Sequence, residues 1–237
     1  AVAVQFDDQL VLGINTWIKP MKFMLSITIY VWTIAWFIGY LEGPRWAVTT
    51  ISWTTSTSML IESVCLIGQA ARGIESHFNL STGFDSAIYT IMGVMIVCNT
   101  LMAIFLLYLL FTRSTRIRLE RIYLWSLRFG IIIFLVGNAD GMLMIQNEAH
   151  TVGLPDGGIG LPLVNWSMEA GDLRIAHFLG LHALQLIPLI GYTISRKRRY
   201  APFRTQMGYL ALFMAVYVGA FILTLQQALA GRPLISL

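Results

Sequence analysis

The sequence predicts an all-α membrane protein, a bundle of six transmembrane helices in one domain covering residues 1–237. Two observations lead to this fold class. Hydrophobic residues make up 57% of the chain and charged residues only 12%, whereas a soluble domain carries about 25% charged residues. Six separate stretches also reach the length of about 20 apolar residues that a helix needs to cross the hydrocarbon core of a bilayer. Much of the surface is therefore expected to face lipid.

The six predicted helices follow one another along the chain and cover residues 21–41, 47–71, 86–111, 122–146, 173–194 and 206–230. The second is the least apolar, because serines and threonines crowd the stretch between Ser52 and Ser58. We do not expect it to face lipid on every side. Residues 5–18, which precede the first helix, are predicted to form a short interfacial segment with Trp17 as its anchor.

Basic residues predict which ends of the helices face the cytoplasm. Two connections, residues 113–121 and 196–199, each hold four cations, and the positive-inside rule places such connections in the cytoplasm. Alternation of the helices then places both termini outside, together with the loops at 72–85 and 147–172. The second of these loops is the one long irregular stretch between helices, a type of segment that often serves as a functional lid.

The N-terminal part departs from this simple pattern in two ways. Lys19 and Lys22 would lie at the outer end of the first helix, against the positive-inside rule. The chain also begins at Ala1 without a methionine. A removed signal peptide or a preceding helix would account for an N-terminus outside the cell.

The basic character of the chain does not indicate a nucleic-acid partner. Although the pI is about 9.2, the cations occupy short runs between hydrophobic segments, which is typical of membrane topology. The predicted partners are membrane lipids and, as an alternative, other membrane subunits. Cys65 and Cys98 both lie inside hydrophobic segments, where we expect small buried side chains and no disulfide framework.

Titratable side chains within the predicted helices are the first candidate functional residues, because an ionisable group inside a bilayer is energetically costly. Glu62, Asp140 and His182 come from three different helices. Each lies about 10–15 Å below the outer end of its helix, at a rise of about 1.5 Å per residue. The sequence therefore predicts three titratable groups at similar depths in the outer half of the membrane.

A second group of polar residues lies at the predicted outer mouth of the bundle. It consists of Arg72, His77, His150, Asp172, Arg174 and His177. All four histidines of the chain thus fall on the same side of the predicted membrane. This asymmetry is the strongest functional signal in the sequence.

Helical spacing connects the two groups. On the second helix, Gln69 and Arg72 continue a polar stripe to which Glu62 belongs, with polar residues recurring every three or four positions. On the fifth helix, Gln185 shares a face with Arg174. Both helices are therefore expected to direct a polar face into the bundle.

The leading hypothesis is a metal-dependent membrane enzyme that acts on a lipid-like or small substrate. Imidazole and carboxylate groups are the ligands of zinc, copper and iron, and a bound metal supplies a hydroxide near neutral pH. The predicted metal ligands are His77, His150, His177 and His182. The predicted catalytic carboxylates are Glu62, Asp140 and Asp172. The predicted substrate-binding residues are Arg72, Arg174, Gln69 and Gln185.

Other interpretations of the same residues stay open. A haem b or quinone-linked electron-transfer subunit would use two of the histidines as axial ligands. A proton-coupled transporter would use Glu62, Asp140 and His182 as a relay. An accessory subunit of a larger membrane complex needs no site, because polar stripes also hold helices together and buried acids also pair with arginines.

Six sequence motifs stand out: WIKPMKF at 17–23, QAARGIESHFN at 69–79, HTVG at 150–153, DGGIGLP at 156–162, NWS at 165–167 and GDLRIAHFLGLHALQ at 171–185. They resemble motifs of a widespread family of uncharacterised bacterial multi-pass integral membrane proteins. The resemblance runs from about residue 12 to the end and assigns no activity. It implies a place in the bacterial inner membrane, one more hydrophobic segment upstream, and a coincidence of the motif residues with the outer-side cluster, whose opening to the periplasm or exterior is predicted from the charges.

Overall fold

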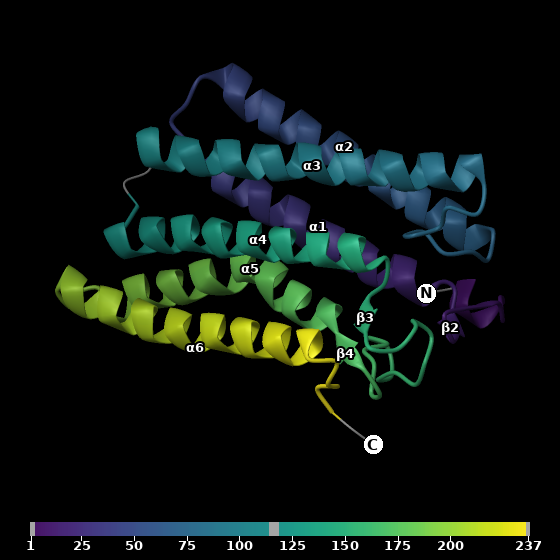
Figure 1. Ribbon diagram of the computed structural model, residues 1–237. Coiled ribbons are helices and arrows are strands. Elements are labelled where there is room, and N and C mark those ends of the chain that lie inside the picture. The colour runs from purple at the N-terminus through teal and green to yellow at the C-terminus, as the bar shows by residue number, and fades with distance from the viewer. Residues whose placement is uncertain (1–2, 114–118, 236–237) are drawn as a thin grey trace.

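Long helices dominate the structure, a computed structural model that describes residues 3–113 and 119–235 (Figure 1). They are α1 (Ile18–Gly39), α2 (Arg45–Ala71), α3 (Gly83–Thr112), α4 (Arg121–Asn147), α5 (Leu173–Lys197) and α6 (Phe203–Leu229). Each one overlaps a predicted helix, so the all-α prediction is confirmed. Within the basic connection predicted at 113–121, residues 114–118 lie outside the described part of the chain.

Five of these helices, α1, α3, α4, α5 and α6, are long and apolar enough to cross a membrane. The remaining helix, α2, is 27 residues long, which exceeds the length a span needs, but it is less apolar than the other five. Its serines and threonines account for the difference. Five helices are therefore compatible with a multi-pass membrane protein, and a sixth transmembrane span formed by α2 stays a prediction.

Local sequence signals explain where several helices begin and end. The Thr82 side chain caps α3 by accepting a hydrogen bond from the Asp85 backbone N–H at 3.1 Å. Asp172 caps α5 in the same way. At the other end of α4, Glu148 adopts a left-handed conformation with φ of 51° and terminates the helix. The start of α3, the start of α5 and the end of α4 are thus each set by a residue at the helix boundary.

Helices α4 and α5 pack closely along their length because glycines line their contact. A Cβ atom added to Gly137 of α4 would overlap the backbone of Gly180 of α5. A Cβ atom at Gly191 would likewise overlap the Ser126 side chain. Small residues at facing positions let two helix backbones approach, as is common between membrane helices.

The buried apolar core falls into two main clusters. One joins α1, α2, α3 and α4, with a contribution from α5, and the other joins α4, α5 and α6. Large apolar side chains also face outward, including Trp32 (69% exposed), Val97 (58%) and Leu212 (66%). Apolar surface on this scale suits contact with lipid and not with water.

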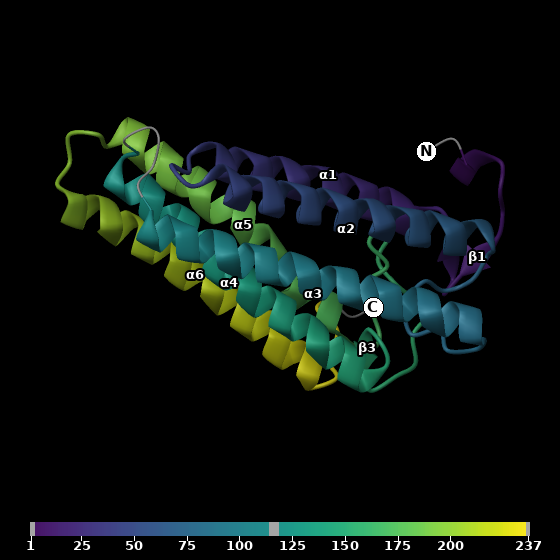
Figure 2. The same cartoon turned by 90° about the horizontal axis from the view of Figure 1, so that it is seen from above.

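The irregular segments gather at one end of the bundle (Figures 1 and 2). Before α1 come a short 3-10 helix (Ala3–Gln5) and a hairpin of β1 (Leu10–Val11) and β2 (Ile14–Asn15). Between α4 and α5, the strands β3 (Thr151–Val152) and β4 (Gly171–Asp172) pair antiparallel. The predicted interfacial segment is therefore a hairpin that leads directly into α1; its position in a membrane stays a prediction.

Candidate functional site

The candidate site lies at the end of the bundle where the N-terminal hairpin, the loop between α2 and α3, and the loop between α4 and α5 converge. Thr16 donates a hydrogen bond to the Ala70 carbonyl at 3.1 Å, which ties the hairpin to the end of α2. Lys22 of α1 donates to the Val164 carbonyl at 3.0 Å, and Asn165 donates to the hairpin. These contacts hold segments together that are far apart in the sequence.

His77 lies on the loop after α2, beside a lysine and three aromatic rings. Its Nδ1 atom is 3.3 Å from Nζ of Lys19 and 2.9 Å from Oγ of Ser76. Because a lysine ammonium is a donor without acceptor capacity, Nδ1 accepts and the proton of the neutral ring sits on Nε2. Burial lowers the pKa of His77 well below its ordinary value, and the nearby Lys19, His150 and His177 act in the same direction.

His150 lies in the loop after α4 and is paired with a carboxylate. Its Nδ1 atom is 2.5 Å from Oδ2 of Asp156. Asp156 also accepts hydrogen bonds from the backbone N–H groups of His150 and Thr151 and from the Thr151 hydroxyl. Burial lowers the pKa of His150, Asp156 opposes this, and Lys19 and Arg174 add to it. The imidazole is therefore neutral near pH 7, with its proton on Nδ1 toward the carboxylate.

His177 of α5 faces α4. Its Nδ1 atom is 2.9 Å from the Gly137 carbonyl oxygen, so Nδ1 carries the proton. The absence of a side chain at Gly141 leaves room for this ring, since a Cβ atom there would lie 3.1 Å from Cε1 of His177. His177 and His150 thus both have an unprotonated Nε2, whereas the Nε2 of His77 is a donor. The structure brings these three predicted residues into one neighbourhood.

His182 lies apart from the other three histidines. Its ring packs on Phe178, with the ring centroids 4.3 Å apart. Gln185, one helical turn further along α5, donates to Oγ1 of Thr33 at 3.2 Å, which connects α5 with α1. Both side chains are half-buried on α5, and Phe178 in turn packs on Trp166 of the loop between α4 and α5.

Arg174 and Asp172 form a closed pair at the start of α5. The guanidinium contacts both carboxylate oxygens, with Nε to Oδ1 at 2.9 Å and Nη2 to Oδ2 at 2.6 Å. Asp172 also accepts from the Ser167 backbone N–H, and Arg174 also donates to the Asn165 carbonyl. The polar groups of these two residues hydrogen-bond to each other and to the loop before α5. Their predicted catalytic and substrate-binding roles stay predictions.

Arg72 and Gln69 are likewise engaged within the protein. Arg72 contacts Oδ1 of Asp85 at 2.5 Å and Oε1 of Gln69 at 2.6 Å. Gln69, which is 1% exposed, donates to the same Asp85 at 3.1 Å. The three side chains join the end of α2 to the start of α3. The contact between Arg72 and Asp85 was not among the predictions, and a substrate-binding role for Arg72 and Gln69 stays a prediction.

Glu62 and Asp140 are the buried carboxylates of the bundle interior. Glu62 of α2 is 3% exposed and Asp140 of α4 is 4% exposed. Among the described residues, both carboxylate oxygens of Asp140 and Oε1 of Glu62 have no hydrogen-bond partner. Buried polar groups in proteins are nearly always paired, so each exception calls for an explanation such as a ligand, an ion or a proton.

The loops of the site are tightly closed and locally strained. The bulky Phe78 has a positive φ of 60°, and Asn165 has one of 56°, conformations that cost energy for residues with a side chain. A crevice beside Arg174 and Asp156 has a volume of about 10 Å³, room for about one water molecule. This crevice is lined by residues of the N-terminal hairpin, the loop between α4 and α5 and the start of α5, and by none of the histidines.

The residue types of the site do not make a metal centre in this arrangement. Among the described residues, no group of three or more His, Cys, Asp or Glu lies close enough together to hold a metal ion. The contact of His77 Nδ1 with the Lys19 ammonium favours the tautomer with the proton on Nε2. The predicted metal and haem b cofactors stay predictions.

Two residues of the site were missed by sequence reasoning. Lys19 lies within the motif at 17–23 and departs from the positive-inside rule, and these two signals pointed to it without predicting its contact with His77. Asp156 lies within one of the motifs but stood out by neither helical spacing nor depth. It becomes recognisable only through its contact with His150.

Comparison of the chain with protein-family models, with curated proteins and with solved structures finds no match.

Proposed function

We propose that this chain is a membrane enzyme that acts on an anionic small or lipid-like substrate by acid–base chemistry. One observation supports this most strongly. Three histidines from three segments lie together with Lys19, each with Nδ1 engaged in a hydrogen bond. Lys19 and the Nε2–H of His77 would donate to the anionic group. The unprotonated Nε2 of His150 or His177 would accept a proton from the substrate.

The proposal includes a membrane orientation. With α2 as a sixth span, the basic end of the bundle lies in the cytoplasm by the positive-inside rule, and the histidine site opens to the periplasm or exterior of a bacterial inner membrane. The loop between α4 and α5 then acts as a lid that moves to admit the substrate, the role that its length and irregular sequence predict.

The anion-binding step has a direct test. Purified protein in neutral detergent is heated with inorganic phosphate or with chloride at equal ionic strength. We expect phosphate to raise the melting temperature of the wild type and of Lys197→Gln, a lysine at the opposite end, but not of Lys19→Gln. An equal phosphate effect in all three proteins, or none in the wild type, would contradict an anion site at Lys19.

The catalytic step is tested by untargeted product analysis. Proteoliposomes made with a total bacterial lipid extract are incubated and the products are measured by mass spectrometry. We expect His150→Gln to lower the rate of product formation by about 100-fold or more, as is typical for loss of an acid–base group. His182→Gln serves as the matched control and should stay within a few fold. Stoichiometric zinc, copper or iron, or a Soret band, would instead favour the metal or haem site.

A proton-coupled transporter is the second candidate, and the unpaired carboxylates of Asp140 and Glu62 favour it. A buried carboxyl without partners is suited to taking up and releasing a proton during transport. Proteoliposomes with an internal pH-sensitive dye would report proton movement when an anionic solute is added outside. Loss of this movement in Asp140→Asn, with no product formed by the wild type, would favour transport over catalysis.

A further inference from the structure

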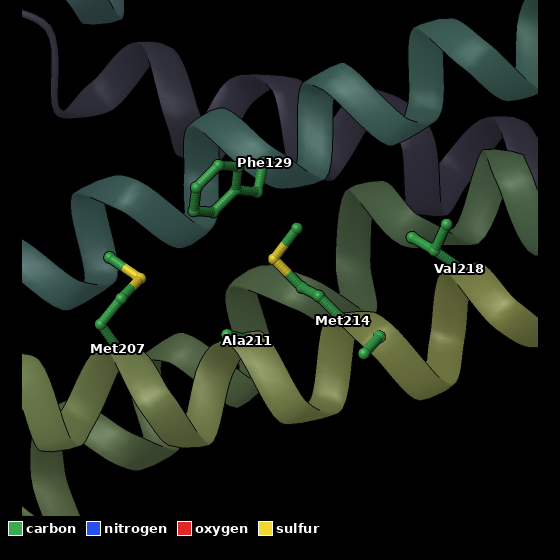
Figure 3. Close-up of a pocket in the computed structure, with 6 residues that line it drawn as sticks. Phe129, Met207, Ala211, Met214 and Val218 are labelled. Atoms are coloured by element: carbon green, nitrogen blue, oxygen red, sulfur yellow. The ribbon is translucent and has the colours of Figure 1, made fainter.

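A groove on the apolar surface between α4 and α6 lies far from the histidine site. It has a volume of about 310 Å³ and is lined by Phe129 of α4 and, from α6, by Met207, Ala211, Met214, Ala215 and Val218 (Figure 3). Every lining side chain is apolar. The lining residues of α6 extend from 207 to 218, which is about 16 Å at the helical rise. The groove therefore has the shape and chemistry to hold a hydrocarbon chain.

Two arginines lie near the end of the groove where α4 and α6 begin. Arg204 precedes Met207 by three residues and so lies on the same face of α6 as the groove. The guanidinium of Arg121, at the start of α4, lies 4.5 Å above the Phe203 ring at the start of α6. Both arginines thus come from the two helices that form the groove, at the end where those helices begin.

Among the described residues, the cations at this end form no salt bridge. Exposed residues here include Arg121 and Arg204 as well as the four cations at 196–199. Within residues 3–113 and 119–235, the salt bridges between two charged side chains are Arg72–Asp85 and Arg174–Asp172, both at the opposite end. The N-terminus of α6 adds the positive end of a helix dipole. An anionic group is the charge-complementary occupant.

Exposed aromatic residues indicate where the membrane surface lies. Tyr200 is 85% exposed and Tyr209 is 45% exposed, and both lie near the start of α6. Tyrosine is enriched at the level of the lipid headgroups. From this level, the groove from Met207 to Val218 extends toward the hydrocarbon interior, which is the direction that an acyl chain takes from its headgroup.

We propose that the groove between α4 and α6 binds an anionic phospholipid, with one acyl chain along Met207–Val218 and the phosphate group at Arg121 and Arg204. This site is separate from the histidine site and does not depend on the proposed enzymatic function. Met207 and Met214 suit the role, because flexible thioether side chains adapt to acyl chains of different shape.

The test measures lipid retention by native mass spectrometry of the full chain in neutral detergent. Phosphatidylglycerol and phosphatidylcholine with identical acyl chains are added in turn. We expect the wild type to retain phosphatidylglycerol about 30-fold more tightly, since two cations act on the headgroup. Arg121→Gln combined with Arg204→Gln should remove this preference. Arg45→Gln, an exposed arginine at the start of α2, is the control and should keep it.

A second variant tests the groove itself. Ala211→Phe places a ring into the groove and should weaken retention of both lipids, whereas Leu212→Phe, at an exposed position outside the lining, should not. Gel filtration confirms folding of each variant. Equal retention of the two lipids by the wild type, or an unchanged preference in the double arginine variant, would overturn the proposal. So would dissociation of a dimer by Ala211→Phe, because a second copy would then be the occupant.

Discussion

At the scale of single residues, two buried aspartates differ in whether hydrogen-bond donors surround their carboxylates. Asp85 is 2% exposed and is surrounded by donors from Thr82, Gln69 and Arg72. Asp140 is similarly buried but lacks a partner among the described residues. A buried carboxylate with donors contributes stability, whereas one without them costs stability and is retained for another reason.

The same substitution should therefore have opposite effects at these two positions. Asp85→Asn is expected to lower the melting temperature in detergent, corresponding to about 1–3 kcal/mol, because charge-assisted hydrogen bonds are lost. Asp140→Asn is expected to raise it, because an amide removes an ionisable group from a site without partners. Thermal unfolding at pH 7.5 measures both. A lower melting temperature for Asp140→Asn would mean that its carboxylate has a stabilising partner.

His77 should make the stability of the protein depend on pH. The pKa of His77 is lowered in the folded state. At a pH below its ordinary pKa of about 6.5, the imidazole therefore takes up a proton in the unfolded chain but stays neutral in the folded protein. Folding stability is then full above pH 7 and decreases as the pH falls toward 5.5, by about 1 kcal/mol per pH unit for one such group. Melting temperatures between pH 5.5 and 7.5 should show this slope, and His77→Gln should reduce it. An unchanged slope would exclude His77 as its source.

At the scale of elements, the contact between α4 and α5 positions the site. It holds the Gly137 carbonyl against His177, and it ends in the loop that carries His150. The close approach depends on Gly137 and Gly180, whose Cα atoms face each other. Any side chain there forces the helices apart and moves the imidazole away from its acceptor.

Gly180→Ala is accordingly expected to destabilise the protein by about 1–3 kcal/mol, the usual cost of overpacking. Gly219→Ala on α6 is the matched control, because nothing lies within 4 Å of a Cβ atom at that position. It should be neutral or slightly stabilising, since alanine favours a helix over glycine. Thermal unfolding of the two variants compares them directly. Equal melting temperatures would show that the two helices adjust without cost.

At the scale of the whole molecule, charge and chemistry are separated along the bundle. Exposed cations lie where α4 and α6 begin and, among the described residues, form no salt bridge there, whereas the salt-bridged acids, the strained loops, His77, His150 and His177 lie at the opposite end. A bilayer across the helices would keep the two ends in different aqueous compartments. The proposed lipid site and the proposed enzymatic site would therefore work at opposite membrane surfaces.

This orientation can be measured by cysteine labelling in intact cells. In a background with Cys65 and Cys98 replaced by serine, Leu154→Cys should react with a membrane-impermeant maleimide, because the loop after α4 is predicted to lie outside. Arg198→Cys should react only after the membrane is permeabilised. The reverse labelling pattern would show that the bundle has the opposite orientation in the membrane, with the histidine site facing the cytoplasm.

The sequence by itself determined the helices. Apolar stretches of spanning length are local properties of the chain, and the observed helices overlap all of the predicted ones. The sequence also indicated why α2 differs, since its polar composition keeps it out of the group of strongly apolar helices. The sequence likewise identified Glu62 and Asp140 as candidates, because an ionisable residue within an apolar run is visible without knowledge of its neighbours.

Only the tertiary structure decided which polar residues meet. Lys19 and His77 are 58 positions apart, and their contact depends on how α1 packs beside the end of α2, which no local pattern encodes. Arg72, predicted to bind substrate, pairs with Asp85 at the start of the next helix, and this contact does not exclude the predicted role. Such partners are chosen by the geometry of converging loops, because hydrogen bonds act over about 3 Å, whereas hydrophobic segments need only their composition to enter a membrane.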